Sequence, residues 1–560
     1  MSRTGLTFIC VIASLTASAV TPQMVSDPAN LKGAEYVNPV IHADYSDPDV
    51  VASPDGKSFY MTASSFQSVP GLPILKSEDL VNWAIVNYAL PEVPPADFYA
   101  AAPQHGKGVW APCIRYHAGK YYIYWGDPDF GIFMINAEDP EGRWCEPVLV
   151  IPGKGMIDPS PLWDKDGKAY LANGWAASRC GFNSVITLWE MAPDGSKVTS
   201  SPRIIYDGND GVNHTVEGPK FYRHGDYYYL FAPAGGVETG WQLVMRSKNV
   251  EGPYEAKIVM AQGNSDINGP HQGAWVTDPA GNEWFLHFQD KGLYGRIIHL
   301  NPMQWVNDWP VIGDDRDGDG CGDPVSKWKK PATAPKAAAD GNGAALASAL
   351  PLRHSADPTL LYQWHANYRP EFGFPLPEGL MRVYGHKLDK EQINLWEVPN
   401  LWLQKFPAEQ FTVTAKVRVS AKSASEGVSS GIVVMGRDYA RLGLLKSGDE
   451  FILQFVTDRD ADLGGSEQVK DIARLKPTRV YAAGLKPNLE CDLWMRVKVA
   501  KDGLCTFSYS TDGKRFTDAG TFTARVGKWI GAKTGFYSIT PAGVPDRGWL
   551  DVISADLEIK

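Results

Sequence analysis

The chain has 560 residues, several times the roughly 150 residues of a typical domain, so two or more folded units are expected. Hydrophobic residues make up 44% and charged residues 21%, a balance that excludes a mostly disordered protein. The net charge is −10 without a run of Lys and Arg, which excludes the basic footprint of a nucleic-acid-binding protein. Aromatic residues make up 11% of the chain, and there are 55 Gly and 41 Pro. Because aromatic residues favour strands and Gly and Pro favour the turns between them, an all-β protein is expected.

The N-terminus has the pattern of a secretory signal peptide. Arg3 precedes a short apolar stretch over residues 6–15, and small residues at 17–19 suit cleavage after Ala19. The apolar stretch is shorter than the ~20 residues that span a bilayer, and no later segment is long and apolar enough. We therefore expect residues 1–19 to be removed and the mature protein to be secreted or periplasmic, with no membrane partner.

Residues 30–325 repeat one pattern five times: a short head, a β-run, a Gly turn and an aromatic-rich β-run. Successive heads lie 47 to 64 residues apart. Five such units, each with about four short strands, predict a five-bladed β-propeller. A sandwich of unequal hairpins is the alternative, but it would not explain five equivalent heads. The heads are Asp47-Pro48, Ala111-Pro112, Asp158-Pro159, Glu217-Gly218-Pro219 and His271-Gln272-Gly273.

The composition changes after the fifth unit. Residues 326–351 are rich in Ala, Lys, Pro and Gly and have the character of a linker. Residues 352–560 then alternate apolar and polar positions, most clearly over 411–419 and 493–499. This period of two suits strands with one buried face and predicts an accessory β-sandwich of jelly-roll type.

Ionisable side chains recur in the heads of the repeat. The innermost strand of each propeller blade lines a central channel, so the five heads should meet at one end of it. Asp47, Asp158 and Glu217 would then lie close together, with His271 beside them. Neighbouring carboxylates disfavour joint ionisation, which provides one protonated acid and one ionised base at neutral pH. That pairing suits hydrolysis of a glycosidic bond.

Aromatic side chains next to the heads are candidates for a sugar-binding wall, because aromatic faces stack on the C–H faces of sugar rings. Trp110 precedes the second head, and Phe66 follows the inner strands of the first blade. Packing in the core is the alternative for each of them.

Four motifs follow one another along the first part of the chain. They are Asn38-Pro39-Val40 with Asp44-Tyr45-Ser46-Asp47-Pro48-Asp49, Gly108-Val109-Trp110-Ala111-Pro112, Met156-Ile157-Asp158-Pro159-Ser160-Pro161 and Thr215-Val216-Glu217-Gly218-Pro219-Lys220. In this order and at this spacing they resemble glycoside hydrolase family 43 over about residues 34–325. The resemblance implies a five-bladed propeller and an inverting, mostly exo-acting β-xylosidase or α-L-arabinofuranosidase. Its substrate would be a xylo-oligosaccharide or an arabinoxylan-type carbohydrate.

The resemblance also implies roles for single residues. Asp47 matches the general base that activates water, Glu217 the general acid, and Asp158 the third carboxylate that tunes and orients the acid. Arg296 resembles an arginine that reaches the substrate. His271 resembles a channel histidine that binds a structural Ca²⁺ or its water shell; the chemistry itself requires no cofactor. Inversion predicts carboxyl groups of base and acid roughly 6.5–9.5 Å apart.

Other acidic residues have simpler interpretations. Asp44 and Asp49 flank the predicted base and are expected to be turn residues. The run from Asp315 to Gly320 resembles the start of a calcium loop, but Ser326 stands where a bidentate Glu is needed, so a polar turn is expected there.

The C-terminal part resembles the concanavalin-like sandwich attached to many β-xylosidases of the family, where it can narrow the mouth of the active site. Two other functions remain open. A retaining fructan hydrolase would carry Arg-Asp-Pro and Glu-Cys pairs, whereas this chain has Ile157-Asp158-Pro159 and Glu217-Gly218. A sugar-binding protein with a decayed site is disfavoured because all three carboxylates are present. The sequence does not separate xylose from arabinofuranose.

Overall fold

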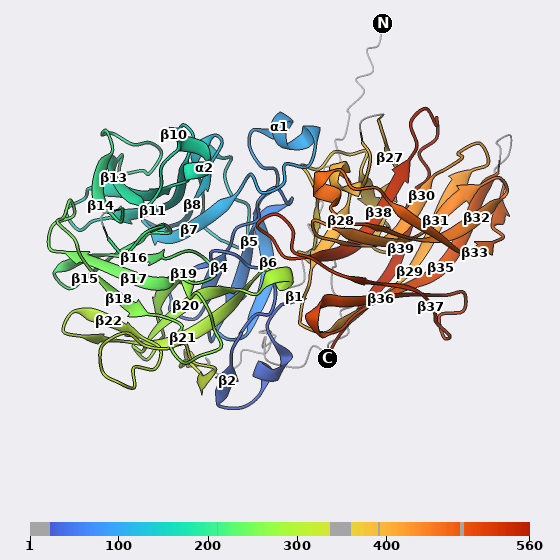
Figure 1. Cartoon of the computed structure of the whole chain (residues 1–560). Coiled ribbons are helices and arrows are strands. Elements are labelled where there is room, and N and C mark those ends of the chain that lie inside the picture. Colours follow the sequence, from blue (N-terminus) through green and yellow to red (C-terminus); the bar gives the residue numbers. More distant parts are fainter. Residues whose placement is uncertain (1–22, 210, 336–359, 390–391, 482–486) are drawn as a thin grey trace, which may run out of the picture.

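The computed structural model of the protein describes residues 23–209, 211–335, 360–389, 392–481 and 487–560. The predicted signal peptide, residues 1–19, and residues 336–351 of the predicted linker lie outside the described residues. Figure 1 shows two β-rich units side by side, the first built from the N-terminal half of the chain and the second from the C-terminal part.

The first unit is a propeller of five antiparallel sheets, and the predicted fold class is confirmed. Neighbouring blades contact one another around the ring, mostly through their innermost strands, and the fifth blade contacts the first. From the axis outward, the first blade comprises β3 (Asp49–Ala52), β4 (Phe59–Thr62), β5 (Gly71–Ser77), β6 (Trp83–Leu90) and β1 (Gln23–Met24). The second comprises β7 (Trp110–His117), β8 (Lys120–Asp127), β9 (Gly131–Ala137) and β10 (Val148–Pro152). The third comprises β11 (Met156–Trp163), β12 (Ala169–Trp175), β13 (Val185–Met191) and β14 (Arg203–Asp207). The fourth comprises β15 (Lys220–His224), β16 (Tyr227–Ala234), β17 (Trp241–Ser247) and β18 (Glu255–Met260). The fifth comprises β19 (His271–Thr277), β20 (Glu283–Asp290), β21 (Arg296–Val306) and β22 (Trp309–Ile312).

The aromatic-rich runs form the second strand of the blades. In β8, every residue from Tyr121 to Asp127 is buried, because a blade packs its two faces against two neighbours. Trp125 is fully buried in a core that also holds Ile74 of the first blade. Most of the aromatic excess in the composition therefore serves packing between blades.

The ring is closed by segments from both of its ends. β1 extends the outer edge of the first blade by pairing with β6. β2 (Glu35–Val37) pairs with β23 (Lys327–Lys329), a strand within the predicted linker. Asn38 adds hydrogen bonds to the backbone of Leu300 in the fifth blade and of Val325. The propeller thus extends at both ends beyond the repeat seen in the sequence.

The second unit is a sandwich of two sheets around the largest hydrophobic core of the described chain. The alternation predicted over 411–419 and 493–499 falls on two paired strands, β29 (Phe411–Lys422) and β35 (Asn488–Val499). One sheet contains β24 (Tyr362–Trp364), β28 (Trp402–Lys405), β38 (Lys533–Thr540), β30 (Ser429–Met435), β31 (Tyr439–Ser447), β32 (Glu450–Asp458) and β33 (Gln468–Leu475), with β27 (His386–Lys387) on β38. The other contains β25 (Gly373–Pro375), β26 (Met381–Tyr384), β39 (Trp549–Ile559), β29 (Phe411–Lys422), β35 (Asn488–Val499), β36 (Leu504–Ser510) and β37 (Thr517–Thr523), with β34 (Thr478–Val480) on β35.

Helices are few and short. Among the residues that the structure describes, none of the helices is long and apolar enough to cross a membrane. They are α1 (Ala96–Ala101), α2 (Ala177–Cys180) and the 3₁₀ turns η1 (Pro28–Leu31), η2 (Gly292–Tyr294), η4 (Leu395–Glu397), η5 (Ala461–Leu463) and η6 (Lys501–Gly503).

The sandwich docks on the propeller through backbone and buried polar contacts. Val69 and Trp364 form an antiparallel bridge between the two units. Lys533 Nζ donates a hydrogen bond of 2.6 Å to Ser68 Oγ, and both side chains are buried. His105 stacks on Trp396 with ring centroids 3.5 Å apart. These contacts fix the sandwich beside the first and second blades.

Candidate active site

The five heads share one backbone feature, a residue in the left-handed region at or just before the first strand of the blade. These residues are Asp47 (φ 57°), Ala111 (34°), Asp158 (57°), Gly218 (59°) and Gln272 (34°). Asp tolerates this conformation better than most residues, and Gly adopts it freely. The repeat read from the sequence is therefore also a structural repeat.

The structure places the three carboxylates in two different head positions. Asp47 and Asp158 are the left-handed residues themselves, whereas Glu217 precedes its left-handed residue, Gly218. From the sequence alone all three carboxylates are expected at equivalent positions, because the heads can be aligned only by residue type. The offset matches a difference in exposure: the side chain of Glu217 is 33% exposed, that of Asp47 8%, and Asp158 is buried.

A cavity of about 260 Å³ lies where the heads meet. The residues predicted from the sequence for the site all line it, so the fold brings them together. The lining residues are Asp47, Phe66, Trp110, Ala111, Ile157, Asp158, Asn183, Thr215, Glu217, Gly236, Val237, His271, Gln272, Arg296 and Trp529.

Asp47 is held by one hydroxyl and one guanidinium. Ser64 Oγ donates a hydrogen bond of 2.6 Å to Asp47 Oδ2 and accepts one of 2.7 Å from the backbone N–H of Ala111. Arg296 Nη1 lies 3.4 Å from both carboxylate oxygens of Asp47. The carboxylate is thus fixed in orientation with one charged partner, and Arg296 joins the fifth blade to the first.

Asp158 is the most deeply buried of the three carboxylates. Burial and the neighbouring Glu217 raise its pKa to about 8, and Asp47 adds to this, although the Gly218 N–H and Lys220 oppose it. The Gly218 N–H donates a hydrogen bond of 2.7 Å to Asp158 Oδ2. The Asp158–Glu217 pair therefore retains one proton at neutral pH, and Asp158 adjoins the backbone that carries Glu217.

Gly174 on β12 makes room for this pair of carboxylates. A Cβ atom at Gly174 would lie 3.3 Å from Asp158 Oδ2 and 3.7 Å from the Cα atom of Glu217. Sequence reasoning missed this residue, because a single Gly inside a strand has no distinctive signal. Its bare backbone lets Asp158 and the fourth head approach each other.

Glu217 faces the cavity and one histidine. Its Oε1 atom lies 3.3 Å from Nε2 of His271, a buried residue whose two ring nitrogens have no hydrogen-bond partner. Calcium prefers a shell of six to eight oxygen ligands. Within the described residues, no group of three or more His, Cys, Asp or Glu surrounds His271, so these side chains alone do not make a calcium site. The Ca²⁺ near His271 stays a prediction, and no chemical step depends on it.

The aromatic wall of the cavity comes from both units. Phe66 and Trp110, the two aromatic residues predicted from the sequence to form this wall, meet edge to face with ring centroids 6.2 Å apart. Trp529, from the sandwich, meets Trp110 at the same centroid distance. The guanidinium of Arg296 lies 4.9 Å from the Phe288 ring and 5.9 Å from the Trp529 ring. No pattern in the sequence points to Trp529, which lies 482 residues beyond Asp47.

Asp44 and Asp49, which the sequence predicts to be turn residues, have a larger structural role, and Asp49 begins strand β3. Both are buried because each has hydrogen-bond donors around it. Asp49 Oδ2 accepts bonds from Arg115 Nη1 (2.6 Å) and the Ile114 N–H (2.7 Å), and Lys220 Nζ lies 3.9 Å away. This ion cluster links three blades beneath the carboxylates. The partners of Asp44 are described below.

The acidic run after the fifth blade forms a surface turn. The carboxylates of Asp315, Asp317 and Asp319 lie within 4.8 Å of one another, and those of Asp315 and Asp319 also accept hydrogen bonds from backbone N–H groups of the same turn. These bonds are those of the polar turn expected from the sequence.

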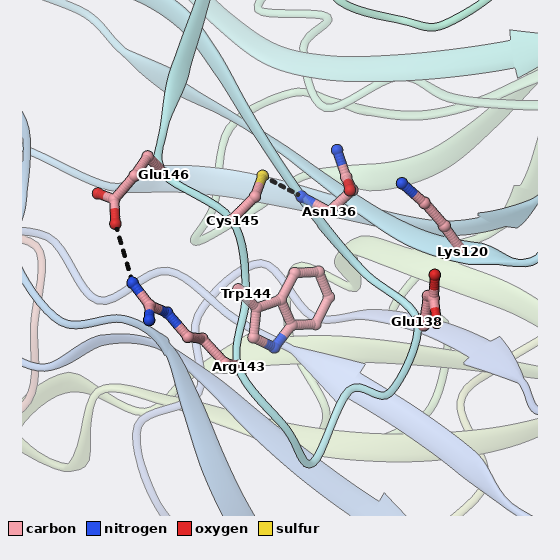
Figure 2. A pocket seen from close by; sticks show the side chains of 7 residues that line it. All are labelled: Lys120, Asn136, Glu138, Arg143, Trp144, Cys145 and Glu146. Atoms are coloured by element: carbon pink, nitrogen blue, oxygen red, sulfur yellow. Dashed lines mark hydrogen bonds and ion pairs between the residues drawn. The ribbon is translucent and has the colours of Figure 1, made fainter.

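A larger cavity, of about 440 Å³, lies beside the loop that joins β9 to β10 (Figure 2). In Figure 2, Arg143 is paired with Glu146, and Cys145 accepts a hydrogen bond from the Asn136 N–H. Arg143 and Glu146 are about nine-tenths exposed. This hollow is open and contains none of the predicted site residues, so the smaller cavity at the heads remains the candidate active site.

Comparison with known proteins identifies the family to which both units belong. Residues 36–310 match the sequence model of glycosyl hydrolases family 43, and residues 355–556 match that of the β-xylosidase C-terminal concanavalin A-like domain. A relative from Xylanibacter ruminicola is 34% identical over 502 residues, which cover 88% of this chain and 84% of the relative. The chain belongs to glycoside hydrolase family 43. The resemblance noted in the sequence is thereby confirmed, and the protein is a glycosidase.

Other members of family 43 have informative names. A β-xylosidase of Formosa agariphila is 28% identical over 560 residues, with 92% of this chain and 89% of the relative covered. A non-reducing end α-L-arabinofuranosidase of Bacteroides ovatus is 31% identical over 308 residues, with 50% and 54% covered. The crystal structure of a xylan β-1,4-xylosidase from Bacillus halodurans superposes with a TM-score of 0.74 at 19% identity, covering 93% of this chain and all of that one. At this identity, the superposition supports the two-unit fold.

Proposed function

We propose that this family 43 enzyme releases xylose or arabinofuranose from the non-reducing ends of plant cell-wall oligosaccharides, by an exo-acting, inverting mechanism. The observation that carries the proposal is the cavity at the heads, which unites three carboxylates, one arginine and three aromatic rings. Its volume of about 260 Å³ is below the ~300–1,000 Å³ typical of sites for larger ligands, which suits a single sugar ring. The names of the relatives from Formosa and Bacteroides support both sugars.

The environments of the carboxylates suggest their roles. Asp47, oriented by Ser64 and Arg296, is placed to take a proton from the water that attacks the anomeric carbon. The Asp158–Glu217 pair holds the proton for the leaving oxygen, because it contains a carboxyl group that is protonated at neutral pH. We assign the transfer itself to Glu217, which reaches the cavity, whereas Asp158 is buried and bonded to the Gly218 N–H.

The aromatic residues and Arg296 would bind the terminal sugar. Phe66, Trp110 and Trp529 offer apolar ring surface. The guanidinium of Arg296 lies near the carboxylate of Asp47 and near the rings of Phe288 and Trp529. Trp529 comes from the sandwich and covers one side of the cavity, which favours an exo-acting enzyme over one with an open cleft. The predicted signal peptide extends the proposal to action outside the cytoplasm.

A panel of nitrophenyl glycosides tests the substrate, and proton NMR of the first product tests the stereochemistry. We expect release from β-D-xyloside or α-L-arabinofuranoside, with the anomer opposite to that of the substrate appearing first. Appearance of the retained anomer would refute inversion. Hydrolysis of sucrose or inulin instead would favour the fructan hydrolase, and binding of xylo-oligosaccharides without release of sugar would favour the sugar-binding protein.

A further inference from the structure

Asp44 is a buried carboxylate at the seam between propeller and sandwich. It lies three residues before Asp47 and is only 4% exposed. A carboxylate taken out of water must recover its hydrogen bonds within the protein. Asp44 therefore needs hydrogen-bond donors from the protein around it.

Three donors from three segments converge on the two oxygens of Asp44. Oδ2 accepts a hydrogen bond of 2.9 Å from the N–H of Gly531, in the sandwich. Oδ1 accepts one of 3.0 Å from the N–H of Arg296 and another of 3.0 Å from Ser46 Oγ. Lys405, also from the sandwich, donates to the backbone carbonyl of Asp44. One side chain thus joins both units.

Two glycines permit this close approach. A Cβ atom at Gly295 would lie 2.5–2.6 Å from three atoms of Asp44, and its φ of 76° is unfavourable for other residues. A Cβ atom at Gly531 would lie 2.7 Å from the carbonyl group of Tyr294. The N–H of Ala532 also donates a 2.7 Å hydrogen bond to the carbonyl of Leu293. The sandwich backbone therefore lies directly against the segment that leads into Arg296.

Each donor that binds Asp44 is adjacent to a group that faces the cavity. Gly531 follows Trp529 by two residues, Ser46 precedes Asp47, and Arg296 carries the guanidinium that contacts Asp47. The same guanidinium lies 5.9 Å from the ring of Trp529. Movement at Asp44 would consequently shift the wall, the arginine and the base relative to one another.

We propose that Asp44 is a positioning residue for hydrolysis, which aligns Trp529 of the sandwich and Arg296 of the propeller with Asp47. It acts through these residues and does not touch the sugar itself. The proposal rests on the proposed function in assuming that the cavity binds the terminal sugar. It makes the sandwich a part of the active site through a defined buried carboxylate.

A double-mutant cycle tests the proposal: Asp44→Asn, Trp529→Ala and the double variant, assayed on the glycoside that the wild type cleaves fastest. Asn keeps the size of Asp44 but turns an NH₂ group toward one of the N–H donors, so kcat/KM should fall roughly 10- to 100-fold. In the Trp529→Ala background the same substitution should lower kcat/KM no more than about threefold, because the effects of substitutions at contacting or coupled sites are non-additive. Equal fold-changes in both backgrounds would overturn the proposal.

Asn367→Ala is the matched control. Asn367 is 2% exposed and also ties the sandwich to the propeller, through hydrogen bonds to the backbone of Val93 and Ala96, which do not line the cavity. We expect this variant to lower the Tm while leaving kcat and KM within about twofold of the wild type. A loss of kcat/KM as large as that of Asp44→Asn would mean that Asp44 merely holds the interface, and would overturn the proposal.

Two further measurements keep the test decisive. If Asp44→Asn does not fold, Ser46→Ala removes one hydrogen-bond donor and keeps the carboxylate of Asp44. This variant should lower kcat/KM roughly two- to fivefold, and its effect should again be non-additive with that of Trp529→Ala. Additive effects would refute the proposal. If the wild type hydrolyses no glycoside, the proposed function fails. The role of Asp44 is then tested by calorimetry of xylose and arabinose binding to the same variants. The effects of Asp44→Asn and Trp529→Ala on Kd should be non-additive.

Discussion

Replacing Asp158 with Asn should stabilise the protein while removing most of its activity. Asn has nearly the shape of the protonated carboxyl group and keeps an oxygen to accept the Gly218 N–H. The wild-type side chain is penalised in the folded state, because burial and the Glu217 carboxylate raise its pKa to about 8. Since Asn cannot ionise, the variant avoids this penalty.

The magnitude follows from linkage between pKa and folding. The carboxyl group has a pKa of about 8 in the folded state and 3.8 in the unfolded state. At pH values between 3.8 and about 8, the folded state therefore binds more protons than the unfolded state. The contribution of Asp158 to the free energy of unfolding of the wild type therefore falls as pH rises from about 4 to 8. At pH 7 the penalty reaches an upper limit of about 4 kcal/mol, from roughly three pH units at 1.36 kcal/mol each.

Urea denaturation between pH 4 and pH 9 measures the effect. The difference between variant and wild type should be near zero at pH 4, grow through neutral pH and level off above pH 8. Asp166→Asn, a change in an exposed turn of the same blade, is the control and should show no such trend. A difference that does not change with pH would refute the reasoning. Activity at pH 7 should fall by about 10²- to 10⁴-fold, as expected for impaired general acid catalysis.

Three further predictions concern other parts of the site and the seam. Asp47→Ala should abolish turnover of nitrophenyl glycosides while the circular dichroism spectrum stays unchanged; turnover at the wild-type rate would exclude Asp47 as the base. Trp529→Ala should raise KM about tenfold or more, as loss of a ring contact worth 1–2 kcal/mol implies, and an unchanged KM would exclude Trp529 from sugar binding. Burial and the neighbouring Lys405 lower the pKa of Lys533 to about 7, against about 10.5 when unfolded, so the contribution of Lys533 to wild-type stability should rise with pH between 7 and 10. Lys533→Met should flatten that rise in a thermal-melt series, and an unaltered slope would contradict the explanation.

The propeller could be predicted from the sequence because each blade repeats its own local signals. Turn residues, aromatic runs and heads recur at similar spacing, and the left-handed residues at Asp47, Asp158 and Gly218 are types that tolerate this conformation. The one-residue offset of Glu217 could not be predicted, because it is a matter of backbone geometry between otherwise similar heads.

The rest of the site depended on contacts between distant segments. Nothing in the sequence near Trp529 or Gly531 indicates that this loop reaches the cavity, since its partners Trp110 and Asp44 lie more than 400 residues away. The burial of Asp44 was missed for the same reason. An acid beside turn residues is usually solvated, and only the docked sandwich removes this one from water.

The pairing of β2 with β23 has a consequence for how the enzyme acquires its site. Residues 35–37 must wait for residues 327–329 before the ring can close, so nearly 300 residues of chain lie between the two partners. Pairing over such a separation is slow compared with local hairpin formation. The individual blades can form as soon as their own strands emerge, but the three carboxylates converge only in a closed ring. Synthesis of the fifth blade and of β23 therefore allows the carboxylates to converge, and the sandwich, which is synthesised afterwards, completes the site with Trp529.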